Sequence, residues 1–183
     1  MIKFQSLLTT LFGGKTLPRK SDNTNPESTF VEDADAGQLI SSAQGPIVVP
    51  AINTIEGSLF NPSDIDLYQI ESERQAFLKF SVAQNPLFSV SFLSSLSLFL
   101  FDETGQGLAA GIGEIGFNFY ENQTLYLGIS DGLNPLNSDG EVLLSPEGEV
   151  NTGTLAGWQE PGIVIPLFIH YRIAIEIETQ PVD

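Results

Sequence analysis

Apolar and polar residues alternate most regularly near the C-terminal end of the chain. Between residues 167 and 177, every second residue is large and apolar, and the residues between them are mostly polar or charged. The apolar set comprises Leu167, Ile169, Tyr171, Ile173, Ile175 and Ile177. A period of two maintained over this length predicts a β-strand with one buried and one solvated face.

Shorter apolar stretches lie upstream, at residues 66–71, 78–82, 88–92, 96–101 and 125–129. The stretch 96–101 is apolar at nearly every position, which predicts a strand that is buried on both faces in the centre of its sheet. Turn-forming pairs such as Asn61-Pro62 and Asp139-Gly140 separate the stretches. Many short strands of this kind predict an all-β fold, an antiparallel β-sandwich or jelly roll, over residues 47–183.

A different period governs the first residues of the chain. An apolar stripe with the spacing of one helical face runs through Phe4, Leu7, Leu8, Leu11 and Phe12. A helix of this length is marginal on its own in water, so it would need a partner surface. We interpret residues 1–20 as an amphipathic docking arm; the simpler alternative is an untethered tail.

The distribution of charge sets this arm apart from the rest of the chain. Residues 1–20 hold Lys3, Lys15, Arg19 and Lys20 and no acid. Residues 21–183 hold three bases and all 23 acids, a formal charge of −20. We therefore expect the apolar stripe to bury against a partner while Lys15, Arg19 and Lys20 meet acidic groups at its rim. Residues 21–46 are polar and turn-prone, which predicts a linker between the arm and the sandwich.

The overall composition excludes several classes of function. The formal net charge of −16 over 183 residues disfavours binding to a nucleic-acid backbone. The chain has no cysteine, which excludes disulfides, thiolate metal sites and cysteine catalysis. It also lacks an apolar run long enough for a membrane-spanning helix.

Residues with catalytic chemistry are few. Gly111, Gly113 and Gly116 match the Gly-x-Gly-x-x-Gly pattern, but no helical period follows, so a flexible loop is expected in place of a nucleotide site. His170 is the one histidine, on the polar face of the last predicted strand and without an acid at short spacing. We therefore expect no catalytic residue and no enzymatic activity. Trp158 is either a sugar-stacking platform or, as we expect, a packing anchor.

Four aspartates are the best candidates for oxygen ligands of a metal. Asp64 and Asp66 are two residues apart, so they would share one face of a strand, and Asp131 and Asp139 follow later in the chain. The alternative is that Asp64 and Asp66 cap a turn at the entrance of a strand, and this is the interpretation that we favour.

Several short motifs occur in an order that resembles the bacterial pre-peptidase C-terminal domain, in the version common in cyanobacterial surface proteins. These motifs lie at residues 35–39, 55–59, 63–70, 98–105, 125–136 and 155–158. The resemblance implies a non-catalytic β-sandwich used for binding or as a spacer in secreted proteins, some of which bind calcium through acidic loops. Where the family carries acids, this chain has Ser94–Ser97 and Gly111–Glu114. We therefore expect no cofactor, and calcium binding that is weak or absent.

Two functions follow from these observations, with an enzyme as a third and weaker alternative. The first is a structural interaction protein, a sandwich that is displayed on a large protein assembly, such as a virion capsid or surface lattice, and docked through the arm. The same features are compatible with a homo-oligomer of this chain. The second is a secreted module of the pre-peptidase type that recognises a polymer or calcium. The first places the protein on a virion surface, and the second places it outside the cell or on the cell surface.

Overall fold

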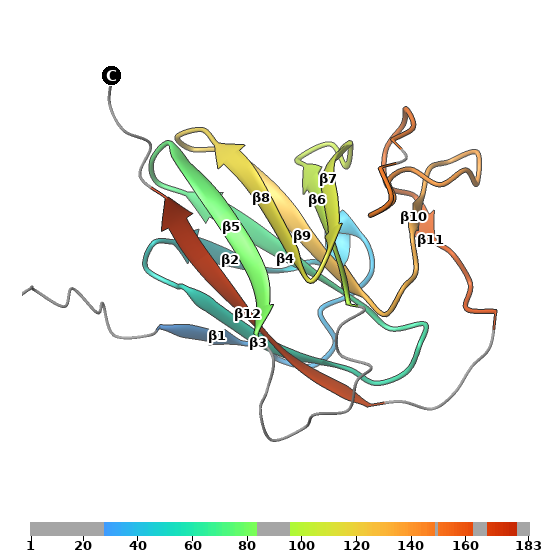
Figure 1. Cartoon of the computed structure of the whole chain (residues 1–183), viewed down its shortest axis with the longest axis horizontal. Helices are drawn as coiled ribbons and strands as arrows, with labels where there is room; N and C mark the ends of the chain where they lie inside the picture. The colour runs from blue at the N-terminus through green and yellow to red at the C-terminus, as the bar shows by residue number, and fades with distance from the viewer. Residues whose placement is uncertain (1–27, 84–95, 149, 163–167, 179–183) are drawn as a thin grey trace, which may run out of the picture.

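Two β-sheets packed face to face make up most of the computed structural model, which describes residues 28–83, 96–148, 150–162 and 168–178 (Figure 1). The predicted all-β sandwich is confirmed. The predicted docking residues (Phe4, Leu7, Leu8, Leu11, Phe12, Lys15, Arg19 and Lys20) and the predicted strand at 88–92 lie outside the described residues. Within the described ranges, no helix is long and apolar enough to cross a membrane.

The first sheet, called sheet A here, contains the long alternating strand predicted at the C-terminal end. Its strands in spatial order are β1 (Thr29–Val31), β3 (Thr54–Leu59), β12 (Ile169–Glu178), β5 (Ala76–Ala83) and β8 (Glu114–Phe119). In β12 the odd-numbered residues from Ile169 to Ile175 are buried, and His170 and Glu176 on the other face are exposed. The alternation of the sequence therefore gave the correct inner and outer faces of this strand.

The second sheet, sheet B, contains the most apolar strands. Its strands in spatial order are β2 (Gln44–Val49), β4 (Ile65–Ser72), β9 (Thr124–Ser130), β6 (Ser97–Asp102) and β7 (Gly107–Ile112). The remaining elements are the short helix η1 (Ile40–Ser42) and the small ribbon formed by β10 (Pro135–Leu136) and β11 (Gly157–Trp158).

Both sheets are mixed, whereas the sequence pattern predicted wholly antiparallel pairing. β1 runs parallel to β3, with Thr29 opposite Thr54, and β2 runs parallel to β4, with Ile47 opposite Ile70. The other strand pairs in the two sheets are antiparallel in the described residues. Both parallel pairs involve edge strands, since β1 lies at one edge of sheet A and β2 at one edge of sheet B.

Part of the segment predicted to be a linker belongs to the sandwich. From residue 28 onward it forms β1, the fully buried Ala36, η1 and the start of β2. Its polar composition is explained by side chains that fix a loop to the body: the Glu32 carboxylate accepts hydrogen bonds from the backbone N–H groups of Ala36 at 3.0 Å and Ser58 at 2.8 Å. The described sandwich therefore begins at β1 and not at residue 47.

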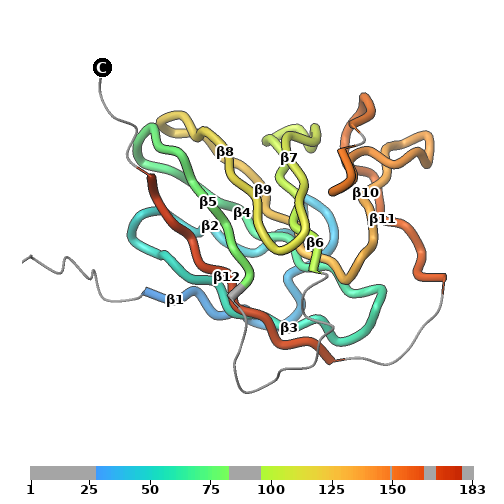
Figure 2. Tube along the Cα trace, in the orientation of Figure 1, coloured from blue at the N-terminus to red at the C-terminus, as the bar shows by residue number. Residues whose placement is uncertain are grey.

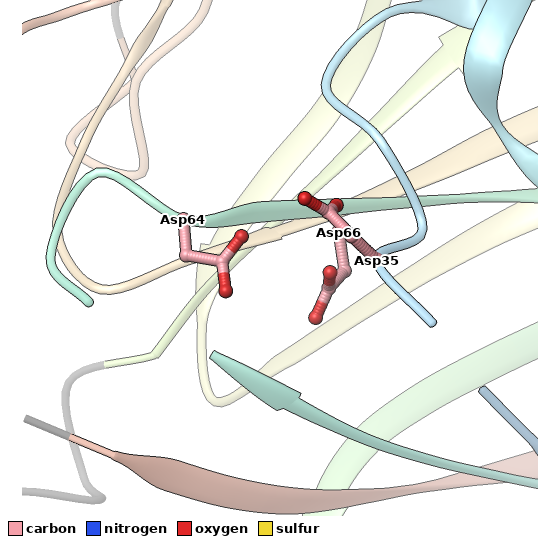
Figure 3. Close-up of side chains that lie close together, drawn as sticks. All are labelled: Asp35, Asp64 and Asp66. Carbon is pink, nitrogen blue, oxygen red and sulfur yellow. The ribbon is translucent and has the colours of Figure 1, made fainter. Parts of the chain in front are cut away.

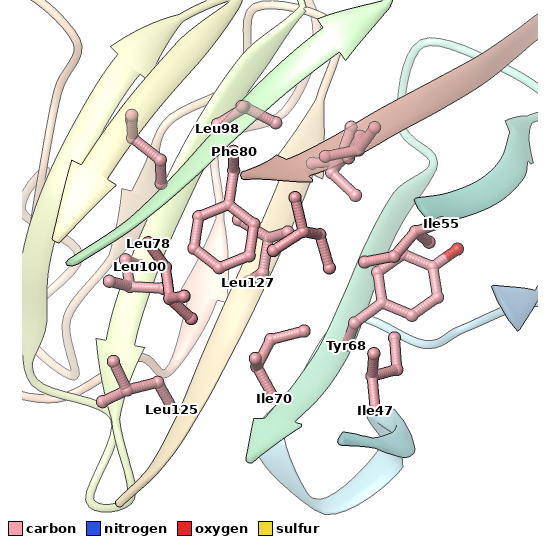
Figure 4. Close-up of a cluster of buried hydrophobic side chains, with 14 of the residues drawn as sticks. Ile47, Ile55, Tyr68, Ile70, Leu78, Phe80, Leu98, Leu100, Leu125 and Leu127 are labelled. Atoms are coloured by element: carbon pink, nitrogen blue, oxygen red, sulfur yellow. The ribbon is translucent and has the colours of Figure 1, made fainter. Parts of the chain in front are cut away.

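The main hydrophobic core lies between the two sheets (Figure 4). Sheet A contributes residues such as Ile55, Phe80 and Ile173, and sheet B contributes residues such as Ile70 and Leu127, all fully buried. Burial of large apolar side chains of this kind, at about 1.5–3 kcal/mol each, is the main source of stability for such a sandwich.

A second, smaller core covers the outer face of sheet B. Leu143, Leu144 and Trp158 from the segment after β9 pack against Phe99 and Phe101 of β6. Figure 2 shows this segment, in orange, folded beside β6 and β7. β6 is therefore buried on both faces, as predicted, but it lies second from the edge of its sheet rather than at the centre.

The glycine-rich segment forms a link between the two sheets and not the flexible loop that we expected. Gly111 belongs to β7 and Gly116 to β8, and the single residue between these strands is Gly113, with φ of 73°. Gly113 donates to the Leu96 carbonyl at 2.9 Å and accepts from the Val82 N–H at 2.8 Å. A strand on either side of Gly113 excludes the strand-to-helix turn that a dinucleotide site requires.

Candidate functional site

Three carboxylates from two distant parts of the chain meet at one end of the sandwich (Figure 3). Asp64 immediately precedes β4 and Asp66 is its second residue, so both project toward the same region, as the two-residue spacing predicted. Asp35 comes from the loop between β1 and η1. One carboxylate oxygen of each residue lies within 4.8 Å of the others. We call Asp35, Asp64 and Asp66 the carboxylate cluster.

The loop that carries Asp35 is held in place by its own polar groups. The Asp35 carboxylate accepts a hydrogen bond from the Gly37 N–H at 2.8 Å, and Gly37 has φ of 73°, a conformation that glycine adopts without strain. Gln38 donates from its side-chain amide to the Ser63 carbonyl at 3.2 Å. These contacts fix the loop against the turn that precedes β4, which is why Asp35 faces Asp64 and Asp66.

Asp64 has the structural role that the sequence favoured. Its Oδ2 atom accepts a hydrogen bond from the Phe60 N–H at 2.6 Å and so closes the turn between β3 and β4. Burial raises the pKa of Asp64, with the charge of Asp35 adding to the rise and the backbone hydrogen bond opposing it. The turn-capping interpretation is therefore confirmed for Asp64, although its carboxylate also belongs to the cluster.

Asp66 is linked to two buried tyrosines that join the sheets. Tyr171 of sheet A donates its hydroxyl proton to Asp66 Oδ2 at 2.6 Å. Because that proton is committed, Tyr68 of sheet B donates to the Tyr171 hydroxyl oxygen, also at 2.6 Å. A Cβ atom on Gly57 would lie 2.4 Å from the Tyr171 hydroxyl, so this position accommodates the hydroxyl pair only as glycine.

The second oxygen of Asp66 has no such partner. Asp66 is fully buried, and its Oδ1 atom makes no hydrogen bond in the described structure. Burial raises the pKa of Asp66 to about 8; the charge of Glu32 and the contact with its carboxyl group add to the rise, and the Tyr171 hydrogen bond opposes it. A buried carboxylate oxygen without a donor is costly, so this site requires a proton or a cation.

The donor set of the cluster suits a hard divalent cation. All three residues offer carboxylate oxygens, with Glu32 against Asp66 as a fourth nearby carboxylate. Calcium takes six to eight oxygen ligands, and three carboxylates supply part of this number. Asp35 is exposed while Asp66 is buried, so the open side of the cluster leaves room for further oxygen ligands from solvent or from a partner.

The structure separates the other candidate ligands from this cluster. In the described residues, Asp131 and Asp139 do not belong to the carboxylate cluster. The sequence did not indicate Asp35 or Glu32, because both lie in the segment taken as a linker, about 30 residues before Asp64 and Asp66. A signal was nevertheless present, since residues 35–39 are the first of the motifs that resemble the pre-peptidase domain.

His170 lies on the exposed face of β12, as predicted, and contacts a serine that the sequence did not indicate. The Ser58 hydroxyl and His170 Nδ1 are 3.2 Å apart. A catalytic triad also requires a carboxylate that orients the imidazole, and in the described part of the chain none is hydrogen-bonded to His170. Trp158 is a packing anchor, as expected: its ring contacts Phe99 and Phe101, and Nε1 donates to the Gln38 carbonyl at 2.8 Å.

Solved structures similar to this chain are β-domains of low sequence identity. One is the pre-peptidase C-terminal domain of collagenase from Bacillus anthracis, with 16% identity and a TM-score of 0.39, covering 84% of this chain and all of that domain. Another is PliG from Aeromonas hydrophila, a periplasmic inhibitor of g-type lysozyme, with 9% identity and a TM-score of 0.38, covering 82% of this chain and 96% of that one.

A second PliG, from Salmonella Typhimurium, has 12% identity and a TM-score of 0.33, covering 73% of this chain and all of that one. No family model matches the chain, and neither does any curated protein sequence. The collagenase domain is of the kind that the sequence motifs resemble, and nothing in these similarities bears on the cyanobacterial surface-protein type. With TM-scores below 0.5, they do not establish a shared function.

Proposed function

We propose that this chain is a non-catalytic β-sandwich interaction module that holds a divalent cation, calcium in the first place, between Asp35, Asp64 and Asp66. The observation that supports this most directly is the fully buried Oδ1 atom of Asp66, which lacks a hydrogen-bond donor beside two further carboxylates. A cation would satisfy that oxygen and offset the repulsion among the acidic groups.

This proposal departs from the weak or absent calcium binding expected from the sequence. That expectation was based on Ser94–Ser97 and Gly111–Glu114, whereas the carboxylate cluster lies on the loop before η1 and at the start of β4. Calcium suits the cluster better than magnesium, because a partly exposed set of carboxylates does not impose the compact octahedral geometry that magnesium demands. Extracellular modules bind calcium in the range of about 10⁻⁴–10⁻³ M, and we place the protein outside the cell or on a surface for this reason.

Thermal unfolding of the full chain tests the proposal. After dialysis against a chelator, calcium should raise the melting temperature, since a ligand at about 100 times its dissociation constant adds about 2.7 kcal/mol to the free energy of unfolding. Magnesium should have a smaller effect. Asp66→Asn should remove the response to calcium, while Asp139→Asn, an exposed aspartate outside the cluster, should keep it.

The sign of the Asp66→Asn effect separates a cation site from a purely structural carboxylate. Without calcium, Asp66→Asn should stabilise the protein at neutral pH, because the folded chain must otherwise keep a proton on Asp66 that the unfolded chain releases. A calcium response of equal size in Asp66→Asn and in the unsubstituted chain would overturn the proposal. The absence of any response up to about 10 mM calcium, well above the range for extracellular modules, would overturn it as well.

The second candidate function is attachment to a larger assembly, such as a virion or a surface lattice, through residues 1–20. The observation that favours it is the contrast between four bases without an acid in this arm and 23 acids with three bases in the remainder. Deletion of residues 1–20 should leave a folded sandwich that no longer joins its assembly. Continued assembly of the shortened chain at the level of the full chain would contradict this role.

A further inference from the structure

Two large aromatic side chains lie exposed against each other at the end of sheet A. Phe60 follows β3 and Phe168 precedes β12, and the antiparallel pairing of Leu59 with Ile169 brings these two residues together. Their exposed fractions are 58% and 62%, and their ring centroids are 5.4 Å apart. We call Phe60 and Phe168 the aromatic patch. Adjacent exposed aromatic residues are typical of a surface that another molecule covers.

Acidic groups adjoin the aromatic patch. The Phe60 N–H donates to Asp64 at 2.6 Å, and Asp64 belongs to the carboxylate cluster with the exposed Asp35. An occupant of this end of the sandwich should therefore combine apolar side chains with positive charge.

The N-terminal arm has that combination of properties. Phe4, Leu7, Leu8, Leu11 and Phe12 form its apolar stripe, and its charged residues are all basic. Three basic residues, Lys15, Arg19 and Lys20, follow the stripe directly. Apolar and basic groups are therefore neighbours in the arm, as the aromatic patch and the acidic groups are neighbours on the body. The rest of the chain has only three bases.

The described chain enters sheet A through β1, at the end of the sheet opposite the aromatic patch. Thr29 of β1 pairs with Thr54, the first residue of β3, whereas Phe60 follows the last residue of that strand. At a rise of about 3.3 Å per residue, the two ends of β3 are roughly 17 Å apart. Docking within one copy would therefore require residues 13–28 to run back along the length of β3, which docking between copies does not require.

We propose that residues 4–12 of one copy dock on the aromatic patch of a second copy, with Lys15, Arg19 and Lys20 near the exposed Asp35. This end of the body stays acidic with a divalent cation bound, because the four carboxylates of Glu32, Asp35, Asp64 and Asp66 outnumber its two positive charges. The proposal rests on the docking role of the arm and names its partner as a second copy of this chain. Because each copy uses two different surfaces, the contact is heterologous and produces either a closed ring or an open chain of subunits.

Sedimentation velocity of the full chain over a range of concentrations tests this proposal. The unsubstituted chain should self-associate, and the double variant Phe60→Ser/Phe168→Ser should do so at least about tenfold more weakly, the loss expected when central aromatic residues of an interface are truncated. Tyr120→Ser is the matched control, since Tyr120 is 61% exposed at the far end of β8. The control should associate like the unsubstituted chain.

Mixing two deficient variants distinguishes docking between copies from docking within one copy. The patch variant keeps its arm, and Leu8→Asp keeps its patch, so each alone should be monomeric while a mixture should form dimers that grow no further. Such dimers require an arm of one copy on the patch of another. Monomers in the mixture, or a monomeric unsubstituted chain at every concentration, would overturn the proposal.

Failure of this proposal and failure of the arm's docking role give different results. If Leu8→Asp abolishes self-association but the patch variant does not, the arm docks on another surface: the docking role stands and the aromatic patch is excluded. If Leu8→Asp self-associates like the unsubstituted chain, the arm does not mediate self-association and the patch proposal is wrong. Attachment of the arm to a different assembly is then decided by the deletion of residues 1–20.

Discussion

Asp66 lies at the start of β4 and Asp102 at the end of β6, both in sheet B, yet their carboxylates differ in the number of hydrogen bonds that they accept. Asp102 Oδ1 accepts three hydrogen bonds, from the Thr104 N–H at 2.8 Å, the Thr104 hydroxyl at 2.7 Å and the Gln106 N–H at 2.9 Å. Asp66 Oδ1 accepts none, although Asp66 is fully buried. The carboxylate of Asp102 stabilises a turn, and the residues of that turn provide its hydrogen-bond donors. Asp66 has no donor for Oδ1, and the carboxylates of Asp35 and Asp64 lie close to it.

The largest expected difference between these two aspartates is in the pH dependence of stability without divalent cations. The pKa of Asp66 is about 8 in the folded chain and 3.8 in its ordinary state. Between these values the unfolded chain releases the proton and the folded chain retains it, so the free energy of unfolding should fall as pH rises from about 4 to 8 and then level off. The loss should reach several kcal/mol, because one pKa unit corresponds to about 1.4 kcal/mol.

Urea denaturation in the presence of a chelator, repeated across this pH range, measures the slope. Asp66→Asn should flatten it, while Asp102→Asn should retain the slope of the unsubstituted chain. An equal slope in both variants would show that Asp66 does not retain a proton in the folded state.

The next largest effect should come from the space around the tyrosine pair. In Gly57→Ala the new methyl group would meet the Tyr171 hydroxyl at 2.4 Å and the Tyr68 hydroxyl at 2.6 Å. We expect a loss of about 2–3 kcal/mol in the free energy of unfolding, the usual cost of overpacking a core. Gly157→Ala is the control, because a Cβ atom there has no neighbour within 4 Å. Equal stability of the two variants would contradict the close packing of the hydroxyl pair.

Removing the donor to Asp66 should have a somewhat smaller effect on stability. Tyr171→Phe would leave Asp66 Oδ2 without its donor and the Tyr68 hydroxyl without its acceptor. The expected cost is about 1–2 kcal/mol, together with a shift of the pH-dependent loss to higher pH, because the Tyr171 hydrogen bond lowers the pKa of Asp66. Tyr68→Phe, one step further from the carboxylate, should leave the position of the pH window unchanged. Denaturation curves at several pH values would show whether the window moves.

The smallest of these effects should be found at Asp102. Asp102→Ala removes the acceptor of three hydrogen bonds in a turn that is open to solvent, so water can accept some of these bonds instead. We therefore expect the free energy of unfolding to fall by about 1 kcal/mol. Calcium should stabilise this variant as much as it stabilises the unsubstituted chain. A calcium response that is lost in Asp102→Ala would mean that the cation binds away from the carboxylate cluster.

The positions of strands could be predicted from the sequence wherever one face of the strand is exposed to solvent. The alternation from Leu167 to Ile177 gave the inner and outer residues of β12, and the spacing of Asp64 and Asp66 placed both on one side. A local pattern of this kind could not predict which strands lie next to a given strand in its sheet, or which segments cover its outer face. β6 is apolar on both faces because Leu143, Leu144 and Trp158 cover it from outside, which resembles the pattern of a central strand.

The candidate site was only half predictable for the same physical reason. Asp64 and Asp66 are close in sequence, whereas Asp35 and Glu32 reach them because β1 pairs with β3 in a parallel arrangement. A short edge strand such as Thr29–Val31 carries too few residues for a pattern to show. The contact between Ser58 and His170 depends likewise on the register of β3 against β12, which no local signal specifies.

The parallel pairing of β1 with β3 determines how the sandwich would respond to mechanical force. Any tension on the N-terminal arm enters the body at Ser28, whose carbonyl accepts from the Asn53 N–H at 3.0 Å, and at Thr29. A pull along the strand axis then loads the hydrogen bonds between β1 and β3 together rather than one after another. If these bonds yield, the tension passes to Glu32, whose carboxylate accepts from Ser58 and Ala36, and then to the loop that carries Asp35. The arm is thus joined to the body by a shear connection, with the carboxylate cluster immediately behind it.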